Sequence, residues 1–215
     1  MRPALVPAVR GPAVVLAVIG AVLWIVPAVL FAGDTGPSRL DVRVQNLVDD
    51  SPAGAWTLVR AMDWLGEPAG RIVLVLAVAA LCLIAGRRAL AVAAVLGIAT
   101  TSVLTTALKP LVDRRIHDDF LSYPSGHVAA ATAAAMVIGL LLADLLRTDR
   151  IGGTAILVAV TVIGGGLSAF AQIHLTAHYP TDALGGFGCG LFVIPPTALV
   201  MNRLARMRAA RPASE

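Results

Sequence analysis

The four histidines of this chain fall in two short polar segments that interrupt otherwise apolar sequence. They are His117, His127, His174 and His178. The first segment, residues 109–127, also contains the only lysine of the chain. A single histidine at a membrane boundary is usually an isolated interfacial residue. Four in two segments favour a shared site for nucleophilic or proton-transfer chemistry.

Pro124-Ser125-Gly126-His127 has the composition of an anion-binding helix start. Ser125 can cap free backbone amides, Gly126 allows close backbone approach, and the helix dipole favours negative charge. His127 would then lie beside the bound anion. Lys109 suits the same ligand, because a compact ammonium on a flexible stem makes a point contact to phosphate.

Asp182 follows His178 by four residues, with Pro180 between them. Pro180 disfavours one continuous helix, so Asp182 is expected to cap the next helix and to bond the imidazole of His178. A carboxylate that fixes the tautomer makes the other ring nitrogen a nucleophile or a base. The alternative is a metal site of His174, His178 and Asp182, which the proline disfavours. We therefore predict a site without metal or cofactor.

The surrounding sequence must position these residues within a membrane. Hydrophobic residues make up 58% of the 215 residues, charged residues 14%, and the mean hydropathy is +0.83. This composition excludes an ordinary soluble domain. About 20 apolar residues span a bilayer, and six segments qualify: 11–32, 70–86, 88–108, 126–146, 151–173 and 182–202. We predict an all-α integral membrane bundle of six helices, with residues 1–206 as one domain and residues 207–215 as a disordered cytoplasmic tail.

Residues 33–69 are too polar to cross a bilayer. Apolar residues there mix with Asp and Arg at roughly helical spacing, which favours a pair of amphipathic helices in the membrane interface. A simple covering loop is the alternative.

The distribution of the arginines along the chain predicts how the protein is oriented in the membrane. The termini and loops assigned to the cytoplasm hold ten basic residues, whereas the opposite loops hold seven basic and ten acidic ones. Both termini are then cytoplasmic, and residues 109–127 and 174–182 face outward from a plasma membrane. The net charge of +4 is explained by this distribution, so nucleic-acid binding is not expected.

Together these segments resemble the type 2 phosphatidic acid phosphatase family, the lipid phosphate phosphatases that share a core with vanadium haloperoxidases. Its motifs are a lysine, six residues and Arg-Pro; then P-S-G-H; then Ser-Arg, five residues, His, three residues and Asp. Lys109, Pro124 to His127, and His178 with Asp182 match in order.

The resemblance implies a membrane phosphatase that needs no metal and acts on a lipid or polyprenyl phosphate, as a monoester or a diphosphate. His178 would form a phosphohistidine, Asp182 would orient it, and His127 would protonate the leaving alcohol. Lys109, Ser125 and Gly126 would hold the phosphate oxygens.

Both family arginines are absent. Arg-Pro falls on Ile116 and His117, and Ser-Arg falls on Ala171 and Gln172. Loss of one such contact commonly costs about a hundredfold in rate. We expect other residues to replace the two missing arginines. The candidates are Arg114 and Arg115 from shifted positions, or His117, His174 and Gln172 as auxiliary groups.

A different class of function is a non-catalytic membrane protein that binds phospholipid headgroups or assists a partner enzyme. The missing arginines favour it. The retained His178 and Asp182 favour catalysis, because binding alone needs no nucleophile. A transporter is less favoured, since paired broken helices at the membrane centre are not evident.

Overall fold

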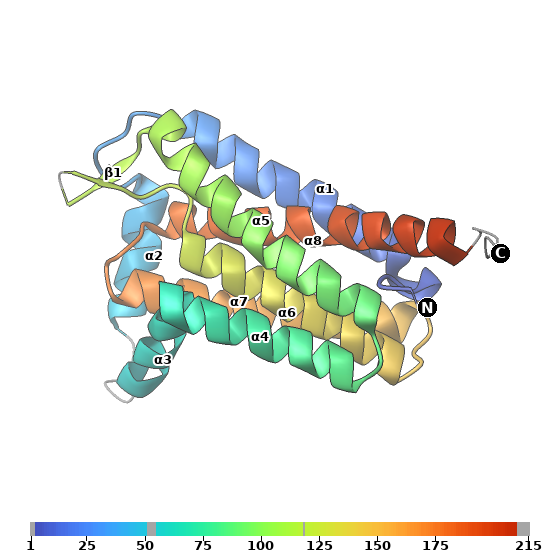
Figure 1. Ribbon diagram of the computed structural model, residues 1–215. Coiled ribbons are helices and arrows are strands. Elements are labelled where there is room, and N and C mark those ends of the chain that lie inside the picture. The colour runs from blue at the N-terminus through green and yellow to red at the C-terminus, as the bar shows by residue number, and fades with distance from the viewer. Residues whose placement is uncertain (1–2, 51–54, 118, 210–215) are drawn as a thin grey trace.

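The computed structural model describes residues 3–50, 55–117 and 119–209 of the chain. Within these residues it is a helical bundle with one small hairpin (Figure 1). The elements in chain order are α1 Pro7–Leu30, α2 Arg39–Asp49, α3 Trp56–Gly66, α4 Pro68–Ile84, α5 Arg88–Val112, β1 Arg115–Ile116, β2 Phe120–Leu121, α6 Gly126–Leu145, α7 Arg150–His174 and α8 Pro180–Ala209.

The helices long and apolar enough to cross a membrane are α1, α5, α6, α7 and α8. α4 follows α3 after a bend of 84°, and this bent pair provides a sixth candidate span. The predicted all-α membrane bundle is therefore confirmed, with the second predicted span, 70–86, displaced by two residues to Pro68–Ile84. α8 remains helical through Ala209, and the rest of the predicted tail, residues 210–215, lies outside the described part of the chain.

α6 forms the centre of the bundle and packs against α4, α5, α7 and α8 (Figure 1). Alanine is the commonest residue on its buried face, which lets neighbouring backbones come close. A Cβ atom on Gly164 of α7 would meet Ala135, and one on Gly190 of α8 would meet Thr132. The glycines of α7 and α8 thus bring both helices close to α6.

Residues 33–69 contain two helices rather than a simple loop. Ser38 and Asp41 form a reciprocal capping box that starts α2: Asp41 N donates to Ser38 Oγ, and Ser38 N donates to Asp41 Oδ2. α2 exposes Leu40 and Leu47 while it packs against α7 and α8. Residues 51–54, between α2 and α3, lie outside the described residues.

The α5–α6 connection contains a hairpin that the sequence did not indicate. Arg115 pairs with Leu121, and Ile116 pairs with Phe120. α2, α3 and this hairpin lie at one end of the bundle, which we call the site end (Figure 1). The first and last described residues lie at the opposite end (Figure 1). The two predicted active-site segments thus occupy the same end of the protein.

Candidate active site

His178 and Asp182 lie where α7 is joined to α8. Asp182 is fully buried in the first turn of α8, and its Oδ2 accepts a hydrogen bond of 3.0 Å from the backbone N of Tyr179. The same Oδ2 lies 3.9 Å from Nδ1 of His178. That distance exceeds a hydrogen bond, and buried Nδ1 has no partner among the described residues. Catalytic hydrogen bonds are often long without substrate, and a shift of about 1 Å would close this one.

Arg114 forms a buried ion pair with Asp182. Its Nη1 donates to Asp182 Oδ1 and to Thr181 Oγ1, both at 2.6 Å, and its Nη2 donates to Asp41 Oδ2 at 2.8 Å. The guanidinium lies between the rings of Phe31 and Tyr179, at 4.4 and 4.7 Å from their centroids. The side chain has no exposed surface. Arg114 therefore does not lie where it could contact a phosphate, contrary to the sequence-based expectation.

Asp41 completes this buried cluster from α2. Its Oδ1 accepts bonds of 2.8 Å from both N and Oγ1 of Thr181. Burial acts to raise the pKa of Asp41, but hydrogen bonds from Ser38 and Thr181 outweigh it and hold that pKa below its usual value. Asp41 is therefore ionised at neutral pH. The Ser38-x-x-Asp41 pattern indicates a helix start, but not the ion pair with Arg114.

His127 lies in the first turn of α6. Ser125 caps this helix, with its Oγ accepting from Val128 N at 3.5 Å, and Ser125 N donates to the carbonyl O of Asp182 at 3.0 Å. Nε2 of His127 lies 3.6 Å from Oδ1 of Asp63 in α3. Asp63 could not be recognised from the sequence, because it is distant from His127 along the chain and belongs to no recognised motif.

Lys109 and Arg71 are two cations that act electrostatically on His127 at this helix start. Lys109 Nζ donates to the carbonyl O of Leu121 at 2.7 Å and is electrostatically coupled to Asp182. Arg71, from α4, donates to Gly66 O at 2.6 Å. A Cβ atom on Gly126 would lie 3.7 Å from Arg71 Nη2. Arg71 belongs to none of the motifs recognised in the sequence, so its place beside Gly126 was missed.

The remaining predicted groups, Arg115, His117 and His174, contact other residues. Arg115 is half-exposed on the hairpin and pairs with Asp113 at 2.9 Å. His117 Nε2 lies 2.8 Å from Thr176 O, and His174 stacks on Phe170 with ring centroids 5.6 Å apart.

Gln172, also predicted as an auxiliary group, is buried. It donates from Nε2 to Asp63 Oδ1 at 3.0 Å. Because Asp63 faces His127, Gln172 reaches the site only through Asp63.

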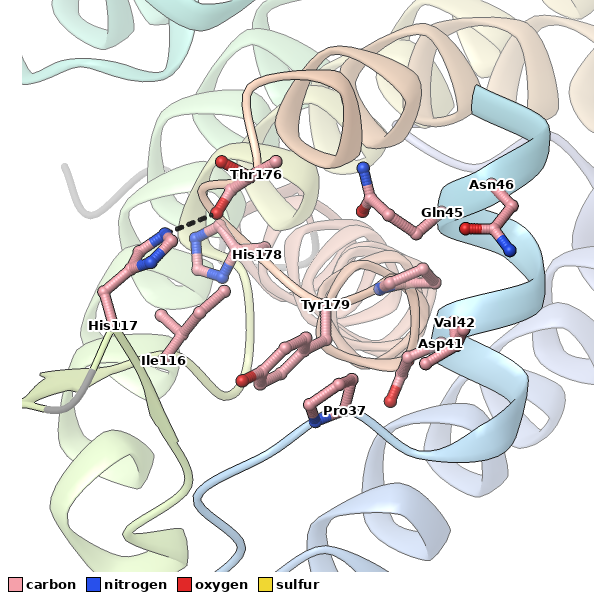
Figure 2. Close-up of a pocket in the computed structure, with 11 residues that line it drawn as sticks. Pro37, Asp41, Val42, Gln45, Asn46, Ile116, His117, Thr176, His178 and Tyr179 are labelled. Carbon is pink, nitrogen blue, oxygen red and sulfur yellow. Dashed lines mark hydrogen bonds between the residues drawn. The ribbon is translucent and has the colours of Figure 1, made fainter. Parts of the chain in front are cut away.

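A pocket of about 250 Å³ opens between α2, the hairpin and the α7–α8 connection (Figure 2). His117 and His178 lie on one side of it, and Gln45 and Asn46 of α2 lie on the other (Figure 2). None of the P-S-G-H residues lines this pocket. It therefore reaches the His178 side of the site.

Comparisons with known proteins show the family and the fold. Residues 90–206 match the sequence model of the PAP2 superfamily. The fold is similar to the crystal structure of the first transmembrane PAP2 type phosphatidylglycerolphosphate phosphatase from Bacillus subtilis, with a TM-score of 0.63 and 17% identity. The alignment covers 92% of this chain and 98% of that one. No curated protein sequence matches the chain.

At 17% identity the structural match establishes the fold alone. The family match is broader evidence, because it includes Lys109, the P-S-G-H segment, His178 and Asp182 within more than half of the 215 residues. This multi-pass membrane protein belongs to the PAP2 superfamily.

Proposed function

We propose that this protein is a phosphatase that hydrolyses a lipid or polyprenyl phosphate through a phosphohistidine, without a metal ion. The observation that carries the proposal is the geometry of His178. Its Nδ1 faces the buried carboxylate of Asp182, which Arg114 and the backbone N of Tyr179 hold in place. Such a partner fixes the tautomer with Nδ1 protonated and leaves Nε2 as the nucleophile.

In the first step, Nε2 of His178 attacks phosphorus and the bond from phosphorus to the leaving oxygen breaks. His127 gives its proton to that oxygen, so the product leaves as an alcohol, or as a phosphate when the substrate is a diphosphate. Asp182 stabilises the positive charge that develops on the attacking imidazole. Splitting the reaction at a covalent intermediate replaces one difficult step with two easier ones.

In the second step, water attacks the phosphohistidine. His127, now neutral, takes the proton from this water, and the N–P bond breaks to release inorganic phosphate. His178 and His127 return to their starting protonation states. His178 therefore makes and breaks the bond to phosphorus, and His127 transfers the proton in both steps, which requires the two rings to face one phosphate.

Lys109, Ser125 and Gly126 are proposed to hold the phosphate oxygens at the start of α6. Arg71 adjoins Gly126 from α4, and it takes the role of a missing family arginine in this proposal. Arg71 Nε is buried without a hydrogen-bond partner among the described residues. A fixed guanidinium beside the transferring phosphoryl group stabilises its equatorial oxygens.

The apolar surface beside the pocket supports an amphiphilic substrate. A groove of about 350 Å³ lies between α2, α7 and α8, and it shares Pro180 with the pocket that contains His178. Leu40, Val44, Leu184 and Phe187 are among the residues that line it. An acyl or prenyl chain suits this groove while the phosphate lies at the site end. We propose that this end faces the extracytoplasmic side and that both termini are cytoplasmic.

The test is phosphate release by the purified protein in detergent, with phosphatidic acid, phosphatidylglycerol phosphate, and polyprenyl mono- and diphosphates as substrates. Turnover is expected without added metal and in the presence of a chelator. His178→Ala is expected to abolish it. A phosphoryl group from labelled substrate should be trapped on the wild type as an acid-labile, base-stable adduct that His178→Ala lacks.

Asp49→Asn is the matched control, because Asp49 lies on the surface of α2 and bonds only to Gln45 in the described structure. Unchanged turnover in His178→Ala, or complete inhibition by the chelator, contradicts the proposal. Binding of lipid phosphate without turnover on any of these substrates favours the non-catalytic headgroup-binding alternative.

A further inference from the structure

α3 contributes a second histidine–carboxylate pair to the site end. Oδ1 of Asp63 lies 3.6 Å from Nε2 of His127, and this nitrogen is buried with no hydrogen-bond partner among the described residues. The two side chains are 23% and 24% exposed, respectively. A movement of about 0.5 Å brings the two atoms within hydrogen-bond range. The imidazole thus faces a carboxylate that the family motifs do not include.

Gln172 holds Asp63 in this position. The Gln172 side chain is 1% exposed and donates from Nε2 to Oδ1 of Asp63 at 3.0 Å. Gln172 occupies the position where the third family motif has arginine. A neutral amide orients Asp63 without cancelling its charge, whereas an arginine there would pair with it. The full negative charge of Asp63 therefore remains available to His127.

Gly66, at the end of α3, lies directly against the ring of His127. A Cβ atom on Gly66 would overlap Cδ2 and Cγ of the imidazole. The backbone at Gly66 is held in turn by Arg71, which donates to its carbonyl O. α3 therefore packs on the imidazole at Gly66 and presents Asp63 to it one helical turn earlier.

We propose that Asp63 is a positioning residue for His127, which it orients and stabilises in the protonated form needed to donate to the leaving group. This inference rests on the proposed function, because it concerns the acid of that reaction. Nε2–H of His127 donates to Asp63, and Nδ1 carries the proton that moves to the leaving oxygen. When water attacks the phosphohistidine, Nδ1 takes a proton back and the Asp63 contact is unchanged.

The charged groups around His127 explain why the imidazole needs the carboxylate of Asp63 in order to stay protonated. His178 from the α7–α8 connection, Arg71 from α4, Lys109 from α5 and Asp63 from α3 all act electrostatically on the imidazole. Asp63 is the only acidic group among these four. Burial is the largest effect that disfavours a positive charge on His127, and the other three groups add to it, so without Asp63 the imidazole would lose its proton at lower pH.

The first experiment compares the pH dependence of kcat in wild type, Asp63→Asn and Asp63→Glu. In Asp63→Asn the alkaline limb is expected to move to lower pH by roughly 1 unit. The loss of kcat at neutral pH should be smaller than the ~10²–10⁴-fold that a general acid contributes. KM should change little, because Asp63 does not touch the phosphate. In Asp63→Glu the alkaline limb should move part of the way back toward its wild-type pH, and in Asp49→Asn it should stay at the wild-type pH.

A second experiment measures the titration of His127 directly, without turnover. The protein has four histidines, so ¹⁵N-histidine NMR in micelles gives few signals, and the absence of one in His127→Asn assigns that residue. The titration midpoint of His127 is expected to be lower in Asp63→Asn than in wild type. Equal midpoints overturn the inference. If the wild type releases no phosphate, the proposed function fails while this measurement still decides whether Asp63 acts on His127.

Gly66→Ala tests the contact between α3 and the imidazole. The added methyl group displaces the ring from its place beside Asp63, so kcat should fall while the helical content by circular dichroism is retained. Ala61→Ser is a matched small substitution, because Ala61 is an exposed residue of the same helix. Full activity in Gly66→Ala would contradict a positioning role for α3.

Discussion

The two histidines of the site differ in how their carboxylate partners are held. Asp182 is fully buried, four residues from His178 along the chain, and it is neutralised by the equally buried Arg114. Asp63 is partly exposed, lies on a helix distant in sequence from His127, and is held by the neutral Gln172. The His178 side of the site is thus an ion-paired cluster, and the His127 side is a contact between packed helices.

This difference follows from the cost of burying charge. A carboxylate removed from water needs an opposite charge and further hydrogen bonds, which Asp182 obtains from Arg114 and Tyr179 N. Asp63 keeps some contact with solvent, so an amide is sufficient. Substitutions on the His178 side should therefore destabilise the fold, whereas substitutions on the His127 side should leave the fold intact.

Arg114→Leu should have the largest effect on stability. It leaves Asp41 and Asp182 buried without their shared cation, and breaking a buried pair in this way costs about 3–5 kcal/mol. Turnover should also be lost, because Asp182 no longer holds its orientation toward His178. Thermal unfolding in detergent and phosphate release measure the two effects.

Arg115→Leu is the control for charge and position. Arg115 is half-exposed and its pairs with Asp113 and Asp119 lie on the surface, so its removal should cost no more than about 1 kcal/mol. Equal unfolding temperatures for the two variants would show that the Arg114 cluster does not stabilise the fold. The proposed contrast between the two sides of the site would then be wrong.

The local features of this site were predictable from sequence. His178 and Asp182 are four residues apart, and Ser125 to His127 form one helix start, so their relation is set by short-range geometry. The long apolar segments likewise predicted the spans within a few residues, because a bilayer requires nearly continuous hydrophobic sequence. The sequence did not predict the bend of 84° between α3 and α4.

The long-range features could not be predicted in the same way. Asp41, Asp63 and Arg71 reach the site only because α2, α3 and α4 fold over its end, and a single sequence contains no signal for such contacts. Arg114 was predicted to face the phosphate, since it is close in sequence to the missing motif arginine. The αL conformation of Asp113, which ends α5, is followed by a hairpin that directs Arg114 inward to Asp41 and Asp182.

Arg71→Ala tests the His127 side of the site. It should lower kcat/KM by about a hundredfold, the usual cost of losing one contact to developing phosphoryl charge. Arg71→Lys should retain part of the activity, because it keeps the charge but loses the planar fork. Stability should fall less than in Arg114→Leu, since Arg71 pairs with the neutral partners Gly66 O and Ser102 Oγ. A larger loss of stability than in Arg114→Leu would reverse the assigned roles.

The smallest expected effect concerns the start of α2, which supports the Arg114 cluster from outside. Ser38→Ala removes a side-chain cap and should lower stability by about 1 kcal/mol at neutral pH. It also removes a hydrogen bond that holds the pKa of Asp41 low, so that pKa should move up toward its usual value. Unfolding temperatures measured from neutral to acid pH test both effects.

The sign of the pH effect follows from linkage. Because folding lowers the pKa of Asp41, its ionised form stabilises the protein above the unfolded value of about 3.9, and this contribution is lost as pH falls through the folded value. Ser38→Ala should therefore lose stability at higher pH than wild type. Asp149→Ala, which removes the exposed cap of α7 at Gly152, should cost about the same at neutral pH without moving the acid transition. Parallel acid transitions for all three proteins would mean that Ser38 supports α2 only as a cap, without tuning the charge that Arg114 neutralises.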